Sequence, residues 1–266
     1  MILKIDPQEI LRSRLVLPKQ GPMHADTDLR NFALINYALP KKRLESHIPD
    51  CFDIPEFEID GVKMSLLSVV PFYDDNFRLS SFPLIKSHFF QTNFRVYVIN
   101  KKTSEHVAWF FGTTLGSQFV RIPQLLWKLP WHHAKYNSQC EYDNFAKRFK
   151  KYEIHIFSNW CNADIDIEDT GRAMGNVKGF ASLDEMRLIL THPIEGYFYR
   201  RDGKIGTYSI WHEEMKGTIG KGRKIYFSLF EKLNLLSREE MNQPHSIFLC
   251  PQIKFKICLP PIVFHD

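Results

Sequence analysis

A strand-like run from Phe89 to Ile99 constrains this chain most, because the two faces of the run differ in chemistry. Side chains alternate across a strand, so one face carries Phe90, Thr92, Phe94, Val96 and Val98. The other face carries Gln91, Asn93, Arg95 and Tyr97. Both flanks are too apolar for an ordinary surface strand. We therefore expect the guanidinium of Arg95 to be half-buried and to need a partner.

The sequence leaves three interpretations of Arg95 open. It is a solvated residue on an edge strand, a member of a structural ion pair, or part of a pocket that Asn93 and Tyr97 also line. A guanidinium holds a carboxylate through two hydrogen bonds. The pocket interpretation therefore predicts a small ligand that carries a carboxylate or a carbonyl group.

Composition favours a folded chain with a large core. Of the 266 residues, 44% are hydrophobic and 22 are Phe, which is enough for one large β-rich domain or two small ones and argues against disorder. The net charge is 35 − 30 = +5 without a long basic run, and the densest cluster, Lys147–Lys151, contains a single aromatic residue. We therefore expect no nucleic-acid partner.

Cysteine spacing and hydropathy indicate the compartment. The five cysteines form no Cys-x-x-Cys pair, which argues against a disulfide framework and a zinc ribbon. Residues 1–17 lack the apolar core of a signal peptide, and no run reaches the roughly 18 apolar residues of a membrane span. We expect a soluble cytoplasmic protein without a membrane partner. The sequence gives no indication of the oligomeric state.

Established motifs for catalysis and cofactor binding do not occur in the sequence. It contains no His-Glu-x-x-His, no Gly-x-Ser-x-Gly and no Walker-type phosphate loop. The segment Gly217–Gly222 is glycine-rich but lacks the Gly-Lys-Thr/Ser ending, and we expect it to form a flexible loop or the rim of a hairpin. The prediction is no metal and no cofactor.

His212 and Glu214 form an alternative candidate site. They end a strand-like run, and residues two apart share a strand face. A histidine and a carboxylate on one face can act as an acid/base pair or contribute to a metal site. A solvated strand end and a structural pair are the other interpretations.

Strand-like runs dominate the remaining sequence. They are Phe32–Leu39, Val62–Phe72, Phe89–Ile99, Val107–Leu115, Ala134–Tyr142, Lys151–Trp160, Gly196–Arg200, Lys204–Glu213, Ile247–Cys250 and Ile253–Cys258. Asp202-Gly203 and the segment Asn100–Ser104 are typical of hairpin turns. Many strands with few helices indicate an antiparallel barrel or sandwich.

Four segments have helical signals. Pro40–His47 and Ile122–Leu129 have a proline near the start, and Leu183–Leu190 follows a capping box that begins at Ser182. Lys224–Leu236 has helical spacing, although its aromatic residues also suit a strand.

Several segments, read in order, resemble the YqjF-like family of uncharacterised bacterial proteins. They are Phe32–Tyr37, Leu44–Pro49, Gly61–Phe72, Asn93–Val98, Val107–Phe111, Leu129–Ala134 and Pro244–Leu249. The resemblance covers nearly the whole chain and depends on the order and spacing of these segments.

This family is similar in fold to acetoacetate decarboxylase. The resemblance implies an α+β, mainly β fold: a cone-shaped antiparallel β-barrel with a few peripheral helices and an internal pocket. We expect residues 1–29 to form an N-terminal extension and residues 30–266 to form a single domain.

The resemblance also bears on mechanism, because the decarboxylase forms a Schiff base through one of two adjacent lysines. The comparable stretch here, Gly112–Leu115 and then Ile122–Gln124, contains no lysine, and Ser65 stands near the position of an acidic residue. Arg30 stands where that enzyme places an arginine for the substrate carboxylate, which makes it a candidate second cation. We expect a ligand pocket without the Schiff-base lysine pair.

Two other classes of function stay open. One is an enzyme of the same fold that uses His212 and a carboxylate for acid/base chemistry. The other is a non-catalytic module that binds a protein partner. Among the lysines near the relevant strands, Lys135 is the one that the pattern allows to face inward.

Overall fold

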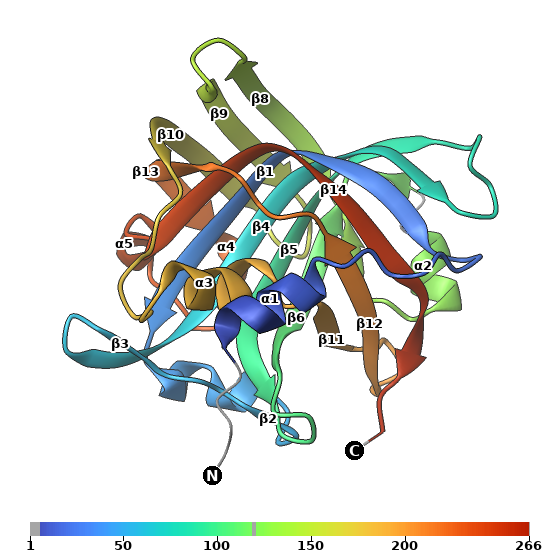
Figure 1. Ribbon diagram of the computed structural model, residues 1–266, viewed down its shortest axis with the longest axis horizontal. Coiled ribbons are helices and arrows are strands. Elements are labelled where there is room, and N and C mark those ends of the chain that lie inside the picture. Colours follow the sequence, from blue (N-terminus) through green and yellow to red (C-terminus); the bar gives the residue numbers. More distant parts are fainter. Residues whose placement is uncertain (1–5, 119–120, 266) are drawn as a thin grey trace.

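Seven strands close into a barrel in the computed structural model, which describes residues 6–118 and 121–265 (Figure 1). In ring order they are β1 (Ala25–Leu39), β4 (Val62–Leu79), β5 (Ser87–Asn100), β6 (His106–Leu115), β11 (Glu195–Tyr199), β12 (Ile205–His212) and β14 (Ser246–Val263). Neighbours are antiparallel except β6 and β11, and β14 closes the ring by pairing with both β12 and β1. The predicted mainly β, antiparallel barrel is thereby confirmed.

Four further strands extend the sheet from the first part of β14 and form what we call the outer sheet. They are β13 (Thr218–Phe227), β10 (Ala163–Ala173), β9 (Arg148–Phe157) and β8 (Lys135–Asp143). Three short strands pair at the margins of the barrel: β2 (Phe52–Asp53), β3 (Phe57–Ile59) and β7 (Trp131–His133).

The helices are short and peripheral. They are α1 (Pro7–Arg14), the 3₁₀ turns η1 (Lys41–Arg43) and η2 (Glu45–His47), α2 (Arg121–Leu126), α3 (Leu183–Met186), the π-helical turn η4 (Arg187–Thr191), α4 (Ser228–Lys232) and α5 (Arg238–Met241). Met186, Ile189 and Leu190 pack among inward-facing barrel residues. Helix α1 packs against α3 and η4 in turn (Figure 1).

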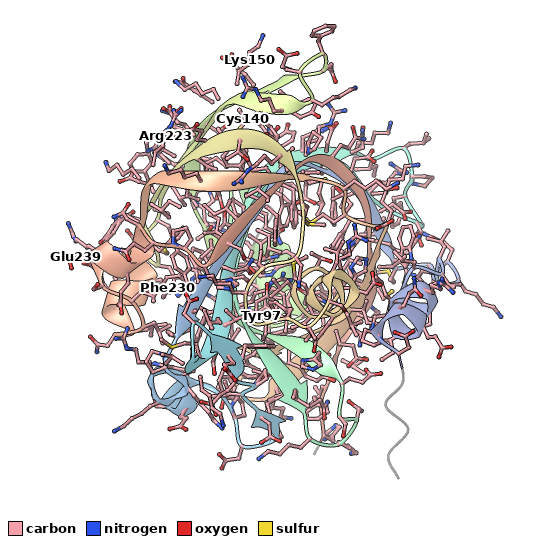
Figure 2. The ribbon with its side chains drawn as sticks, turned by 60° about the vertical axis from the view of Figure 1, so that its left-hand side comes forward. Tyr97, Cys140, Lys150, Arg223, Phe230 and Glu239 are labelled. Carbon is pink, nitrogen blue, oxygen red and sulfur yellow. The ribbon has the colours of Figure 1, made fainter. Side chains whose placement is uncertain are left out.

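Both faces of β5 are buried, which explains why both flanks of this strand are apolar. Phe94, Val96 and Val98 pack outward into a large core that the barrel shares with the outer sheet. Tyr97 points the other way, into a second core within the barrel. Figure 2 shows Tyr97 among the barrel strands and Lys150 at the far margin of the outer sheet.

Several local predictions are confirmed. The turn after Asn100 joins β5 to β6, and Asp202-Gly203 joins β11 to β12 with Gly203 at φ +81°. Ser182 caps α3 by accepting a hydrogen bond from the backbone of Glu185. The helical signal after Pro40 forms two 3₁₀ turns, η1 and η2.

Other local predictions are wrong, and packing gives the reason. Gly217–Gly222 is largely strand β13 instead of a loop, because a Cβ at Gly220 would come within 2.8 Å of Ile247 and Ile167. Only glycine allows the strands to approach so closely. The segment Lys224–Leu236 divides into the end of β13 and helix α4.

Strands β10 and β14 also differ from the predicted set. Strand β10 has no counterpart among the predicted runs, because acidic residues alternate with its buried Ile165 and Ile167. The two predicted runs at the end of the chain form one strand, β14, which stays paired with β1 on both sides of Pro251, through Cys250 opposite Phe32 and Gln252 opposite Arg30.

The N-terminal segment packs on the barrel. Strand β1 begins at Ala25, within the predicted extension, and Leu11 of α1 is buried. The indole nitrogen of Trp211 donates to the carbonyl of Leu15 at 3.1 Å. No helix in residues 6–118 or 121–265 is long and apolar enough to cross a membrane, and no disulfide joins any of the five cysteines in this part of the chain.

Candidate ligand cavity

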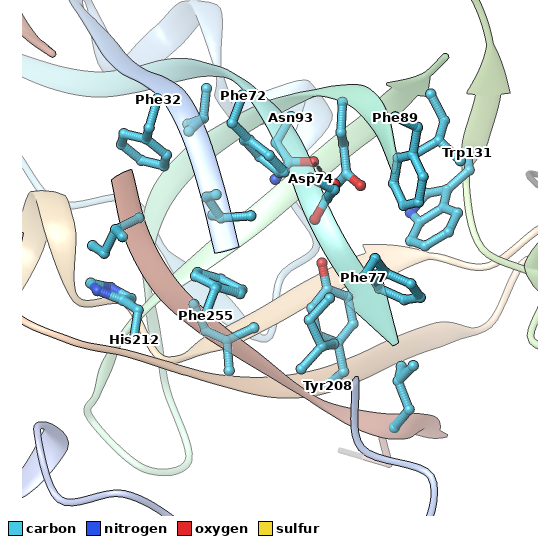
Figure 3. A pocket seen from close by; sticks show the side chains of 18 of the residues that line it. Phe32, Phe72, Asp74, Phe77, Phe89, Asn93, Trp131, Tyr208, His212 and Phe255 are labelled. Carbon is cyan, nitrogen blue, oxygen red and sulfur yellow. Dashed lines mark hydrogen bonds between the residues drawn. The ribbon is translucent and has the colours of Figure 1, made fainter. Parts of the chain in front are cut away.

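A cavity of about 380 Å³ lies inside the barrel, along the inner face of β4 and β5. Its wall is mainly aromatic and aliphatic (Figure 3), and its aromatic members include Phe32, Phe72, Phe77, Phe89, Trp131 and Phe255. A volume in this range suits a small-molecule site, since such sites are typically apolar with a few polar groups. The polar side chains are therefore the ones that decide what the cavity can hold.

Three polar side chains follow one another along β5 toward one end of the cavity. Gln91, Asn93 and Arg95 alternate into it, as the strand period requires. The side-chain oxygen of Asn93 accepts hydrogen bonds from Gln91 at 3.0 Å and from Thr113 at 2.8 Å. Its amide nitrogen donates to no residue in the described part of the chain, so it is available to a ligand.

Arg95 is buried and has no counter-ion in the part of the chain that the structure describes. It is 8% exposed; its Nε donates to Ser68 at 2.9 Å and its Nη2 donates to the carbonyl of Leu190 at 3.2 Å. The guanidinium carbon lies 5.4 Å from the centre of the Tyr97 ring. Across residues 6–118 and 121–265, no carboxylate forms an ion pair with Arg95. A buried positive charge thus faces the cavity without a negative partner.

Tyr97 lies behind Arg95 and not in the cavity wall. Its hydroxyl is within hydrogen-bond distance of Asn36 Oδ1, at 2.7 Å, and of the carbonyl of Leu190, at 3.2 Å. Burial raises the pKa of Tyr97, which keeps it neutral. The residue supports Arg95 through its ring face instead of lining the cavity itself.

Arg30 lies outside the described cavity wall. Its side chain is 51% exposed, and its Nε lies 2.7 Å from the carboxylate of Asp75. The pattern of β1 changes at Asn31, which has φ +50° and marks a register shift in the pairing with β4. Leu29 and Phe32 therefore both line the cavity, although they are three residues apart, and Arg30 points away.

His212 lines the cavity, but both of its ring nitrogens have backbone partners. Nε2 lies 2.7 Å from the carbonyl oxygen of Thr191, and Nδ1 lies 2.7 Å from that of Glu213. The ring stacks on Phe255 with a centroid distance of 5.7 Å. Burial lowers the pKa of His212, while the two carbonyl acceptors oppose that shift. Both ring nitrogens are engaged by the backbone and are not free for a ligand.

The structure does not bring Glu214 into a pair with His212. Strand β12 ends at His212, so the alternation that would place both residues on one face stops there. Glu214 lies 2.9 Å from Arg187 and forms an ion pair with it. No group of three potential metal ligands occurs in the described part of the chain.

Asp74 is a polar cavity residue that the sequence reasoning missed. It lies on β4 in phase with Val70 and Phe72, beyond the predicted end of that strand. Thr27 donates to its Oδ1 at 3.1 Å, while Oδ2 is buried and has no hydrogen-bond partner among the described residues. Burial raises the pKa of Asp74 to about 8, so at neutral pH it is mainly the uncharged acid.

Tyr208 presents its hydroxyl to the part of the cavity where the carboxyl group of Asp74 lies. Figure 3 shows its hydroxyl directed toward Asp74. No hydrogen bond of the Tyr208 side chain occurs within the described residues, and burial raises its pKa. The strand period of β4, continued past Phe72, and the alternation of β12 are the signals that could have found this pair.

The segment between β4 and β5, which we call the rim loop (residues 80–86), borders the cavity with apolar side chains. Phe82 and Ile85 line the cavity and are nevertheless 57% and 68% exposed. Trp127, just after α2, lines the cavity too. Arg78 and Ser87, on either side of the rim loop, line the cavity as well. The rim-loop end of the cavity is thus apolar with a polar margin, and it reaches the surface.

No lysine is present in the described lining of the cavity. Lys135, which the pattern allowed to face inward, is exposed. The buried lysine is Lys256, which alternates with the cavity residues Phe255 and Ile257 and faces the other way, with its amine 2.7 Å from Asp26.

Residues 26–254 match DUF2071, a family described as an uncharacterized conserved protein. The chain belongs to the DUF2071 family. The YqjF-like resemblance of the sequence is consistent with this membership. Among curated proteins, no significant sequence match was found.

Solved structures with a similar fold are acetoacetate-decarboxylase-like. The enduracididine biosynthesis enzyme MppR, in complex with pyruvate, has a TM-score of 0.59 at 8% identity, over 94% of the DUF2071 chain and 93% of its own. Acetoacetate decarboxylase from Legionella pneumophila has a TM-score of 0.55 at 9% identity, over 100% and 98%. An acetoacetate decarboxylase-like enzyme from Sphingomonas wittichii RW1 has a TM-score of 0.53 at 6% identity, over 92% and 94%. At these identities the likeness concerns the fold alone.

Proposed function

We propose that this DUF2071 protein binds a carboxylate or carbonyl compound inside the barrel, with Arg95 as its anchor. The observation that carries the proposal is the buried guanidinium of Arg95, which faces the cavity without a counter-ion in the described chain. Asn93 provides a free amide donor one step along the same strand face. The ring of Tyr97 lies behind Arg95 and makes a cation–π contact with its guanidinium.

Electrostatics explain why an anionic group suits this position. An isolated buried charge is costly unless it is paired and hydrogen-bonded. Ser68 and Leu190 satisfy two of the donors of Arg95 but supply no negative charge. A ligand carboxylate would supply that charge and accept two hydrogen bonds from one planar group.

The proposal does not include a Schiff base. It is supported by the described cavity wall, which contains no lysine amine that could attack a carbonyl carbon. Acid/base chemistry by His212 is not favoured either, because both ring nitrogens lie 2.7 Å from backbone carbonyls. For location we propose the cytoplasm, where cysteines that form no disulfide among the described residues would stay reduced.

Ligand-dependent thermal stabilisation tests the proposal. The wild-type protein is screened against a panel of carboxylic acids of different chain length, together with the corresponding amides. We expect acids to raise the Tm and Arg95→Met to weaken their binding at least about tenfold, since a hydrogen bond to a charged group contributes about 1.5–3 kcal/mol. Methionine keeps an unbranched side chain in the buried site.

Arg30→Met is the matched control, because it removes a guanidinium from β1 that lies outside the described cavity wall. It should bind the same acids as the wild type does. Equal loss of binding in both variants, or no stabilisation of the wild type by any acid, would contradict the proposal.

A further inference from the structure

Two polar groups of the cavity lie far apart along its wall. The first point is Arg95, and the second point is the pair of Asp74 and Tyr208. The strand register places Arg95 opposite Ser68, and Asp74 opposite Phe89. Six residues of extended strand separate Ser68 from Asp74, which corresponds to about 20 Å. A compact acid bound at Arg95 would leave the second point, and most of the wall, without a contact.

The second point is built from Asp74 and Tyr208. Asp74 is 2% exposed, and within residues 6–118 and 121–265 its Oδ2 has no hydrogen-bond partner. A protonated carboxyl group donates one hydrogen bond and can also accept one, as a phenol does. Buried polar groups normally have partners, and Figure 3 shows the Tyr208 hydroxyl directed toward Asp74. This pair therefore suits an uncharged oxygen of a ligand, such as a hydroxyl or a ketone.

Most of the wall around the two points is apolar, although Asn93 and Gln91 of β5 face the cavity between them, opposite Val70 and Phe72. Val70 and Phe72 separate Ser68 from Asp74 on the inner face of β4, and Phe255 and Ile257 lie on β14. At the far end, Phe82 and Ile85 of the rim loop both line the cavity and reach the surface. Such a wall stabilises a hydrocarbon chain by removing it from water.

We propose that the ligand is a long-chain fatty acid that carries one hydroxyl or oxo group along its chain. The carboxylate binds Arg95, the chain follows the inner face of β4, and the oxygen is held by Asp74 and Tyr208. The inference rests on the proposed function, which requires only that Arg95 binds an acid. It adds the length of the ligand and the position of its second oxygen.

Binding of ricinoleate and oleate to the full chain, freed of lipid, tests the inference. The two acids differ by one hydroxyl group and are compared by titration calorimetry below their critical micelle concentrations. We expect both to bind and ricinoleate to bind about tenfold more tightly, as one added hydrogen bond of about 1.4 kcal/mol would give. Arg95→Met should weaken both acids alike.

Three variants at the second point sharpen the test. Asp74→Leu and Tyr208→Phe should remove the preference for ricinoleate while oleate still binds. Asp74→Asn should keep the preference, because the amide is uncharged and has the shape of the protonated acid. Circular dichroism establishes that each variant is folded before binding is compared.

The outcomes separate this inference from the proposed function. Arg95-dependent binding of short acids without binding of either long acid would overturn the inference and leave the function standing. Equal affinity for ricinoleate and oleate, or a preference that survives in Asp74→Leu, would overturn the role of the second point. If no acid of any length binds, both proposals are overturned.

Discussion

At the scale of single residues, Arg95 and Asp74 are buried side chains of the same cavity that differ in charge. The guanidinium of Arg95 keeps its charge, as guanidinium groups do in proteins, and rests on the face of Tyr97. The carboxyl group of Asp74 takes up a proton instead, because desolvation raises its pKa to about 8. A charged group and an uncharged acid thus share one apolar cavity.

Asp74 should make folding stability depend on pH. Its pKa is about 8 in the folded chain and 3.8 as its ordinary value, so between these values the folded state binds more protons than the unfolded state. Stability from this group is therefore lost as the pH rises from about 4 to about 8. We expect Asp74→Asn to remove that loss. The free energy of unfolding of the variant, relative to that of the wild type, should therefore be a few kcal/mol higher at pH 8 than at pH 4. Urea unfolding at both pH values measures the difference.

Asp75→Asn is the control for this prediction, since Asp75 is adjacent in sequence but forms an ion pair with Arg30. It should not produce the gain at pH 8. A wild type and an Asp74→Asn variant with the same pH dependence would show that Asp74 is charged in the folded protein.

At the scale of elements, a single irregularity in β1 decides which of its residues reach the cavity. Asn31 has φ +50°, and the pairing of β1 with β4 shifts between Arg30 and Ile35. Bulges of this kind change the face on which later residues lie. Phe32 consequently faces the cavity while Arg30 faces solvent.

Substitutions at Asn31 test whether its backbone conformation matters. Asn31→Gly should leave stability nearly unchanged, because glycine adopts positive φ readily. Asn31→Val should reduce the free energy of unfolding by about 1–2 kcal/mol, since a left-handed conformation is costly for an L-residue with a branched Cβ. Chemical denaturation compares the two variants. Equal stability of both would mean that the bulge relaxes at no cost.

At the scale of the whole molecule, β5 separates two cores. Its outward face packs against the outer sheet, and its inward face lines the cavity. The outer core therefore stabilises the barrel wall without filling the barrel interior. This arrangement leaves a preformed cavity in a chain whose composition would otherwise fill one continuous core.

The whole-molecule arrangement of lysines leads to a chemical prediction. Lys135 is exposed and Lys256 faces away from the cavity. We expect incubation with acetoacetate and borohydride to leave no reduced imine, because a Schiff base requires an amine close to the bound carbonyl. Intact-mass spectrometry measures this, with an acetoacetate decarboxylase as positive control. A stoichiometric adduct on any one lysine would restore a decarboxylase-type mechanism.

The sequence was sufficient for the parts that depend on local pattern. Alternation over Phe89–Ile99 predicted the two faces of β5, and Asp202-Gly203 predicted a hairpin. The ordered motifs predicted a barrel of the acetoacetate-decarboxylase type, which the fold comparison confirms. These features follow from backbone geometry and from the spacing of apolar residues along the chain.

Only the tertiary structure decided which polar side chains meet. The sequence predicted Arg95 and Asn93 as pocket residues, and both lie in the cavity wall, while their role in binding stays a prediction. A bulge in β1 directs Arg30 away from the cavity, and the continuation of β4 past Phe72 places Asp74 in the cavity wall. Local pattern determines the faces of a strand. Strand ends, bulges and barrel closure are determined by packing between distant segments, so they alone decide which faces enclose the same space.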